Sequence, residues 1–140
     1  MYKKIMIAID GSETAHQALV EAENIANTYD ATLCVVYSVV HTVDGDLEAA
    51  RKIGYEILDQ AKSSVSTLNT ETRLLVPDTG FGLNSITEAI ATAATDWDAD
   101  LVVVGTANRR GLKRFFVGSV AEQLITKINS SMLLVRPPKA

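Results

Sequence analysis

The sequence has few of the residues on which metal centres and covalent catalysis depend. Its 140 residues include one cysteine and two histidines. A single cysteine excludes an intramolecular disulfide and a cysteine metal cluster, and Cys34, inside an apolar run, is expected to be a small core residue. His16 and His41 lack the carboxylate or cysteine spacing of a metal site, so we expect them on the surface or in a loop. No nucleophile, base and orienting group can be assembled into a catalytic set.

Long apolar runs and an excess of positive charge are absent as well. No stretch approaches the roughly 18 apolar residues that a membrane helix needs, and the run 5–9 is too short for the core of a signal peptide. We therefore expect a cytoplasmic protein that does not bind membranes. With 17 acidic against 13 basic residues and a net charge of −4, the chain lacks the basic face of a general nucleic-acid binder. Walker-type phosphate loops and the His-Glu-x-x-His zinc helix are also missing.

Short apolar runs alternate with longer amphipathic segments along the chain. The runs are expected to form five strands, at residues 5–9, 33–40, 73–76, 101–104 and 132–135. The segments are expected to form four helices, over residues 12–28 and 47–68, from Ser85 to about Trp97, and from Gly118 and Ser119 onwards. Five strands separated by helices with right-handed crossovers give an α/β fold, a doubly wound parallel sheet with helices on both faces. We expect a single domain over residues 1–140.

The junction between the fourth strand and the last helix has the features of an anion site. The strand ends at Gly105, and the helix begins at Gly118 and Ser119. Unpaired backbone N–H groups and the positive end of the helix dipole converge at such a helix start, so we predict a phosphate site there. Ser119 and Glu122 also fit a capping box, which would hold the helix start with or without a ligand.

The loop 106–117 is long for a connection inside a compact α/β unit, and loops of this length are often functional. It carries four of the 13 basic residues: Arg109, Arg110, Lys113 and Arg114. In an acidic chain, this cluster concentrates positive charge beside the predicted phosphate site. A solvated basic loop without a ligand is the alternative interpretation.

Asp10 follows the first strand and is a second candidate for the site. If the first and fourth strands flank the crevice where strand order reverses, Asp10 faces the Gly105 loop. Its carboxylate could accept hydrogen bonds from ribose hydroxyls or lie near a phosphate-bound cation. An Asx turn with Gly11 that caps the first helix is the alternative. The segment GFGLNS at 80–85 is similar to a dinucleotide fingerprint, but it follows the third strand, so we interpret it as a turn and a helix cap at Ser85.

Three stretches of the sequence together resemble the universal stress protein family. They are MYKKIMIAIDGSETAHQALVEAENIA, ATLCVVYSVV and VVVGTANRRGLKRFFVGSVAEQLITKINSSMLLVR, and they cover nearly the whole chain in order. The resemblance implies a Rossmann-like fold of the adenine nucleotide alpha hydrolase-like type, with spatial strand order 3-2-1-4-5. It also implies a homodimer through the last strand, Met132 to Val135, whose apolar edge would otherwise risk aggregation.

Nucleotide-binding members of the family carry a glycine, two residues, a second glycine, nine residues, and then glycine with serine or threonine. In this chain Gly105 and the pair Gly118-Ser119 match that pattern, and Asn108 stands where the second glycine is expected. Asparagine is the non-glycine residue that best tolerates the left-handed conformation, so the turn can form. Its side chain can either crowd the phosphates or donate a hydrogen bond to them. The resemblance therefore implies binding of ATP or another adenine nucleotide.

The resemblance also implies which residues line the nucleotide pocket. The adenosine end is lined by Ala8, Ile9 and Asp10, and the adenine is met by the backbone of Ser38. Beneath the nucleotide lie Val104 and Gly105, and around the phosphates lie Thr106, Asn108 and Arg109. The helix start contributes the Ser119 hydroxyl and the N–H groups of Gly118, Ser119, Val120 and Ala121. A Mg²⁺ ion bridging the phosphates is compatible with this set, although no carboxylate cage for a metal is visible.

Three functions are compatible with these features. The one we predict is an adenine-nucleotide-binding stress or regulatory protein that is not an enzyme beyond weak ATP hydrolysis. A slow ATPase or phosphoryl-transfer enzyme would need a residue that positions water or an acceptor, and the sequence offers only Asp10. A nucleotide-free dimeric interaction module is the third, and Asn108 is its only support.

Overall fold

The computed structural model describes residues 1–11, 13–39, 45–66, 69–77, 83–106 and 119–136. Its strands are β1 (Lys4–Ile9), β2 (Thr32–Ser38), β3 (Thr70–Leu75), β4 (Leu101–Gly105) and β5 (Ser131–Val135). Its helices are α1 (Glu13–Tyr29), α2 (Leu47–Ser64), α3 (Leu83–Trp97) and α4 (Ser119–Lys127). Among the helices described, none combines the length and the apolar character needed to span a bilayer.

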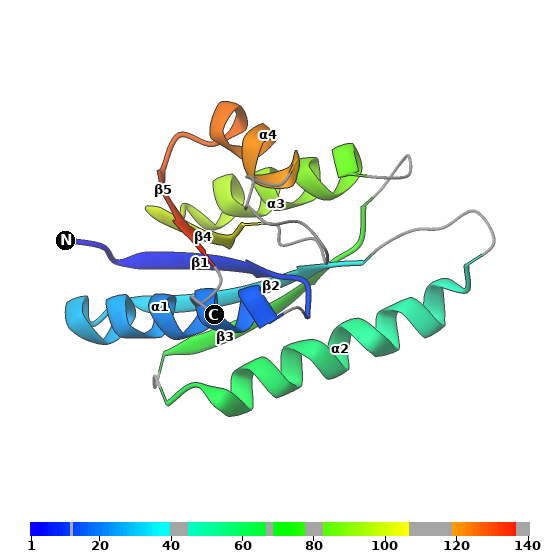
Figure 1. Ribbon diagram of the computed structural model, residues 1–140, viewed down its shortest axis with the longest axis horizontal. Helices are drawn as coiled ribbons and strands as arrows, with labels where there is room; N and C mark the ends of the chain where they lie inside the picture. Colours follow the sequence, from blue (N-terminus) through cyan, green and yellow to red (C-terminus); the bar gives the residue numbers. More distant parts are fainter. Residues whose placement is uncertain (12, 40–44, 67–68, 78–82, 107–118, 137–140) are drawn as a thin grey trace.

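The five strands lie parallel in one sheet with the order β3-β2-β1-β4-β5 (Figure 1). This confirms the predicted doubly wound α/β fold and its strand order. From β1 at the centre, the chain first moves outward through β2 and β3, and then through β4 and β5 on the other side. Because right-handed crossovers in opposite directions put their helices on opposite faces, α1 and α2 cover one face and α3 and α4 the other. Strand order reverses between β1 and β4.

The alternating side chains of β1 belong to two separate hydrophobic cores. Ile5 and Ile7 pack on one face, against α1 and α2, and Met6 packs on the other, with α3 and α4. All three side chains are fully buried. Burial on both faces explains why this strand is an uninterrupted apolar run in the sequence rather than an alternating one.

Two elements begin two or more residues earlier than the sequence predicts. α3 begins at Leu83, so Ser85 lies inside its first turn, and the prediction that Ser85 caps the helix is wrong. The apolar spacing of Ile86 and Ile90 is compatible with a start at Leu83, but it does not show where the backbone of the helix begins. β3 begins at Thr70 rather than at residue 73, because an edge strand that is only partly buried can pair its polar residues with β2.

Two elements end two or more residues earlier than the sequence predicts. α2 ends at Ser64 rather than at residue 68, because Val65 adopts an extended backbone with φ −101° and ψ 143°. β2 ends at Ser38, although the next residue, Val39, still donates its N–H to the Leu75 carbonyl of β3 at 2.8 Å. Apolar residues thus continue beyond the regular elements, and the ends are set by backbone geometry that the apolar pattern does not report.

Asp100 holds the amino ends of β1 and β4 together. Its carboxylate accepts hydrogen bonds from the N–H groups of Lys3 at 2.8 Å and Lys4 at 3.1 Å. Its own N–H donates to the Lys4 carbonyl at 2.9 Å. These contacts fix the register of the two strands that flank the reversal of strand order, and therefore the level at which their carboxyl ends finish.

Cys34 lies in β2 and is fully buried, which confirms that it is a core residue. Burial raises the pKa of its thiol from 9.0 to about 12, with a smaller contribution from the charge of Glu71, its partner in β3. The thiol is therefore protonated at neutral pH and is a poor nucleophile.

We expect this thiol to make the protein less stable in alkali. The unfolded thiol ionises near pH 9.0 and the folded one near pH 12, so the unfolded state loses its proton first. The contribution is fully present below the lower value and is lost as the pH rises toward the higher one, at up to about 1.4 kcal/mol per pH unit. Urea unfolding across this range measures the slope.

Cys34→Ala is the control for this prediction, because it removes the thiol and leaves every other ionisable group. Burial also raises the pKa of Tyr37, but that contribution is common to both proteins and cancels in the comparison. The stability of the variant should fall less steeply above pH 9.0. Equal slopes in the two proteins would contradict the assignment.

Candidate functional site

Three polar residues lie side by side at the carboxyl ends of the neighbouring strands β2, β1 and β4. The register of β1 with β2, continued by one residue, puts Asp10 opposite Ser38. The register of β1 with β4, continued by two residues, puts Thr106 on the other side of Asp10. Neighbouring strands are about 4.8 Å apart, so the three residues are contiguous. We call Ser38, Asp10 and Thr106 the carboxyl-edge row.

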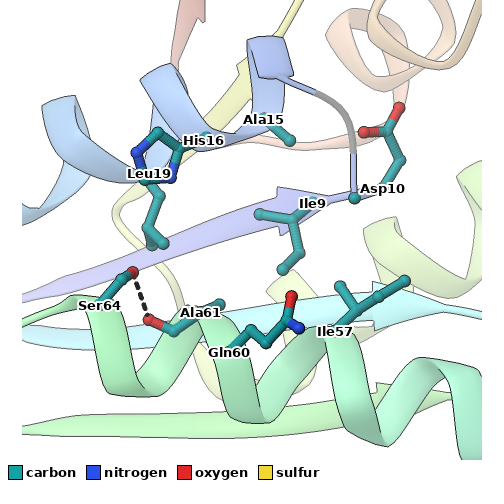
Figure 2. Close-up of a pocket in the computed structure, with 10 residues that line it drawn as sticks. Ile9, Asp10, Ala15, His16, Leu19, Ile57, Gln60, Ala61 and Ser64 are labelled. Atoms are coloured by element: carbon teal, nitrogen blue, oxygen red, sulfur yellow. Dashed lines mark hydrogen bonds between the residues drawn. The ribbon is translucent and has the colours of Figure 1, made fainter.

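The side chains of the row point to the face of the sheet that α3 and α4 cover. Val36 and Val104, two positions before Ser38 and Thr106, pack in the core on that face. Side chains alternate along a strand, so Ser38 and Thr106 share this face. Figure 2 shows the Asp10 carboxylate pointing away from the space between α1 and α2. The row therefore lies where strand order reverses, at the position where open α/β sheets bind ligands.

The two hydroxyls of the row are buried and lack hydrogen-bond partners among the residues that the structure describes. Ser38 is 7% exposed and Thr106 is 5% exposed. Neither the Ser38 Oγ nor the Thr106 Oγ1 has a partner within the part of the chain that the structure describes. A buried hydroxyl left unpaired costs about 1–3 kcal/mol, so such groups are uncommon without a reason. Asp10, between them, is exposed and has an interaction of its own.

Gly105 ends β4 where α1 passes too close for a side chain. A Cβ at this position would lie 2.8 Å from the Thr14 Cγ2 and 3.3 Å from the carbonyl carbon and oxygen of Thr14. The sequence pattern predicts a glycine here for the approach of the backbone to a phosphate. The structure adds a packing reason, because the glycine allows β4 and α1 to come together beside the row.

The start of α4 follows the row in the chain. α4 begins at Ser119, as predicted, with Val120 half-buried and Ala121 buried in the core that it shares with α3. The N–H groups of a first helical turn have no partner within the helix and attract anions. Glu122 lies in the same turn.

The predicted site residues are only partly brought together. Ala8 and Val104 lie on the α3/α4 face beneath the row, whereas Ile9 points toward α1 and α2, so only its backbone borders the row. Several residues lie outside the described part of the chain: Asn108, Arg109, Arg110, Lys113, Arg114, Gly118, the side chain of Ser119, and His41. The prediction of a basic phosphate loop therefore stays a prediction.

Tyr37 is a neighbour of the row that the sequence did not single out. Burial raises the pKa of its phenol, and the negative charge of Asp10 raises it further. Tyr37 packs on the α1/α2 face, so its ring lies on the opposite side of the sheet from the Ser38 hydroxyl. The electrostatic contact still indicates that Asp10 lies close to the end of β2.

A cavity of about 480 Å³ lies between α1 and α2, and its lining includes Asp10 of the row and Gly11 at the end of β1 (Figure 2). Its inner wall includes Ile9 and Leu19, and its outer rim includes His16, Gln60 and Ser64. His16 is exposed, as the sequence predicts. Helical spacing gave no signal for this cavity, because the distance between two helices on one face is a tertiary property.

Metal ligands are not gathered anywhere among the described residues. No group of three or more His, Cys, Asp or Glu side chains could hold a metal ion in those ranges. The row contains one carboxylate, so it could meet a divalent cation only together with other oxygen ligands, such as those of a phosphate.

Comparison with known proteins identifies the family of this arrangement. The universal stress protein family model matches residues 1–136. A universal stress protein from Methanocaldococcus jannaschii is 32% identical, and the alignment covers 99% of this chain and 85% of the relative.

Two solved structures share the fold. A universal stress protein in complex with cAMP has a TM-score of 0.73 and 22% identity, with 98% of this chain and 99% of that one covered. The universal stress protein from Archaeoglobus fulgidus in complex with dAMP has a TM-score of 0.67 and 24% identity, with 96% and 98% covered. The fold is the Rossmann-like one of adenine nucleotide alpha hydrolases. The family match over nearly the whole chain, and the same strand order in the sheet, show that this protein belongs to the universal stress protein family.

Proposed function

We propose that the protein binds an adenine nucleotide, ATP or AMP, across the carboxyl-edge row. The observation that carries this proposal is the row itself, in which a carboxylate lies between two buried hydroxyls at the reversal of strand order, neither of which has a partner in the described part of the chain. Membership of the universal stress protein family supports it, as do the complexes of two structural relatives with cAMP and dAMP.

In this proposal the nucleotide lies along the row from β2 to β4. Ala8, Asp10 and the backbone of Ile9 contact the adenosine. Ser38 contacts the adenine base. Val104 and Gly105 lie beneath the ligand. The phosphates are contacted by Thr106 and by the start of α4, at Ser119, Val120 and Ala121. Asn108, Arg109 and Gly118 would complete the phosphate end. Mg²⁺ would arrive with the phosphates, because the row supplies one carboxylate.

We propose that the protein is a single domain that acts in the cytoplasm and has a regulatory role in a stress response. Its function is then to bind the nucleotide rather than to hydrolyse it. Phosphoryl transfer needs a group that positions water or an acceptor, and Asp10 is the candidate within the row. If Asp10→Asn leaves any ATP hydrolysis unchanged, the enzymatic alternative loses its candidate residue.

We also propose that the partner is a second copy of this chain, joined along β5. This strand is at the edge of the sheet, and Met132 to Val135 are half-buried. An apolar edge strand with one unpaired side invites a partner strand. Light scattering at micromolar concentration should give the mass of a dimer, and a monomer would contradict the proposal.

The first test of the binding proposal is a search for nucleotide in freshly purified protein. Denaturation followed by chromatography and mass spectrometry identifies any released adenine nucleotide. The stripped protein is then titrated with ATP and Mg²⁺ and with AMP. We expect micromolar binding that is lost in Gly118→Val, because a side chain there would crowd the helix start. Neither released nucleotide nor binding up to millimolar ATP would contradict the proposal.

Asn108→Gly in the same titration tests the nucleotide-free alternative. If the variant binds ATP and the natural chain does not, the asparagine has closed the site, and the protein is a dimeric interaction module. Similar affinities in the two proteins would remove the only support for that alternative.

A further inference from the structure

The cavity between α1 and α2 opens on the face of the sheet opposite the one to which the side chains of the carboxyl-edge row point. Its apolar lining comes from β1, α1 and α2, at Ile9, Ala15, Leu19, Ile57 and Ala61. Ile9 and Leu19 point toward α2 across this space (Figure 2). Small-molecule pockets measure about 300–1,000 Å³, and the 480 Å³ of this cavity lie within that range. The cavity is therefore large enough for a small organic molecule.

Small side chains leave this space open. α2 lies directly on the sheet at Gly54, where a Cβ would be 2.5 Å from the Leu74 Cδ1. Two turns later, α2 presents Ala61 to the cavity, and α1 presents Ala15. Both alanines are buried, and neither is long enough to fill the gap between the helices. Because protein interiors are normally close-packed, an apolar gap beside a tightly packed stretch of the same helix favours an apolar ligand.

Contacts between the elements close the cavity at both ends. At one end, Ile57 of α2 reaches the chain after β1, since a Cβ on Gly11 would lie 3.3 Å from its Cδ1. At the other end, the Glu23 carboxylate of α1 accepts hydrogen bonds from the N–H and the hydroxyl of Ser66, both at 2.7 Å. Ser66 follows the end of α2. A helix or strand of another protein would have to run out past these contacts, so the closed ends favour a small molecule.

The rim of the cavity determines the polarity of the ligand. Gln60 can donate and accept hydrogen bonds, and Ser64, whose hydroxyl donates to the Ala61 carbonyl at 2.8 Å, can still accept one. The described residues of the lining include no lysine or arginine, and the Asp10 carboxylate points away from the space (Figure 2). An anion would therefore lose its hydration without gaining a counter-charge, which is costly. The lining favours a neutral molecule.

We propose that this cavity binds a small neutral molecule that is mainly apolar and carries one hydrogen-bond donor. Its apolar body lies between α1 and α2, against Ile9 and Leu19, and its donor bonds the Ser64 Oγ at the rim. This site lies beyond the proposed nucleotide site, because the hydroxyls of the row point to the other face of the sheet. It does not depend on the proposed function.

The experiment uses 2-naphthol, a neutral fused aromatic ring system with one hydroxyl. It is titrated into nucleotide-stripped, ¹⁵N-labelled protein, and the amide chemical shifts report which residues it contacts. We expect saturable shifts at the lining residues of α1 and α2, with a dissociation constant of about 1 mM or lower. 2-Naphthoate keeps the ring system but replaces the hydroxyl with a carboxylate, and it should bind at least tenfold more weakly.

Three variants locate the ligand within the cavity. Ala61→Leu fills the space from α2 and should weaken the binding of 2-naphthol at least tenfold, and Ala15→Leu does the same from α1 if the first variant does not fold. Ser64→Ala removes the acceptor and should weaken binding about two- to tenfold. Ala49→Leu, at an exposed position of α2 outside the lining, is the matched control and should leave binding unchanged. Thermal unfolding of each variant alone checks that it is folded.

Four results would overturn the proposal. The first is the absence of saturable shifts at the lining residues up to the solubility limit of 2-naphthol, and the second is equal affinity for 2-naphthoate. The third is displacement of 2-naphthol by millimolar AMP, because the probe would then occupy the row. The fourth is a dependence of the lining signals on protein concentration without any probe, which would assign the space to a second copy of the chain. None of the four contradicts nucleotide binding, which the ATP and AMP titrations test separately.

Discussion

Replacement of Gly105 by valine is expected to destabilise the protein and to weaken nucleotide binding at least tenfold. The new Cβ would lie 2.8 Å from the Thr14 Cγ2 and 3.3 Å from the carbonyl group of the same residue. The methyl group can turn away, but the backbone of α1 cannot, so the end of β4 must move. Overpacking of this kind costs about 1–3 kcal/mol, and β-branched valine adds to the crowding.

The loss of affinity follows from the position of Gly105 immediately before Thr106. Movement of the strand end displaces Thr106 relative to Asp10, and hydrogen bonds to the ligand weaken as their distances and angles leave the favourable range. Urea unfolding measures the stability, and titration with ATP and Mg²⁺ measures the affinity, which should fall at least tenfold.

Thr14→Ala provides the control for the Gly105 prediction. It removes the nearest carbon atom and leaves the backbone contacts at 3.3 Å. The double variant Thr14→Ala with Gly105→Val should therefore be more stable than the sum of the two single changes predicts. Unchanged stability in Gly105→Val would contradict the packing argument, and lost stability with full affinity would separate Gly105 from the site.

Gly54→Val is expected to lower the free energy of unfolding by about 1–3 kcal/mol, or by more if α2 cannot move. Gly54 lies on the face of α2 that packs on the sheet, where a Cβ would lie 2.5 Å from the Leu74 Cδ1 and 3.0 Å from the Tyr37 Cδ1. The flexible end of Leu74 can turn, whereas the ring of Tyr37 is broad and half-buried. Close contact between helix and sheet therefore outweighs the gain in helix propensity on removing a glycine, about 1 kcal/mol at most.

The matched control is Ala49→Val, on the same helix at an exposed position. It should cost only the difference in helix propensity, about 0.5–0.7 kcal/mol. Adding Leu74→Ala to Gly54→Val removes the nearest obstacle, and the double variant should be more stable than additivity predicts. Urea unfolding of the natural chain, the three single variants, including Leu74→Ala, and the double variant measures these differences. A Gly54→Val protein as stable as the Ala49→Val protein would refute the explanation.

The elements and the fold class follow from local patterns in the sequence. An apolar run that is buried on both faces indicates a parallel strand, and the regular alternation with amphipathic segments indicates crossovers. Right-handed crossovers then restrict the possible sheets, and the family resemblance supplied the order 3-2-1-4-5. The boundaries were less certain, as the starts of α3 and β3 show, because apolar spacing does not record where backbone hydrogen bonds end.

The sequence named candidate site residues but did not show how they are arranged. Asp10 and Thr106 were both expected beside a nucleotide. The structure puts Asp10 between Ser38 and Thr106, at the ends of three neighbouring strands. The family resemblance assigned a contact with the adenine only to the backbone of Ser38, because the sequence does not show whether a hydroxyl in a strand has a hydrogen-bond partner. That became visible once burial and the absence of a partner among the described residues were known.

By itself, then, the sequence determined the alternation of strands and helices, the burial of Cys34, and the glycine–serine pattern that points to a phosphate. Only the tertiary structure decided that three strand ends meet in one row, that Gly54 and Gly105 are required by close packing, and that α3 starts before Ser85. The physical reason is that periodicity depends on neighbours along the chain, whereas strand register, helix–sheet distance and hydrogen-bond satisfaction depend on residues that are distant in sequence and meet only in the fold.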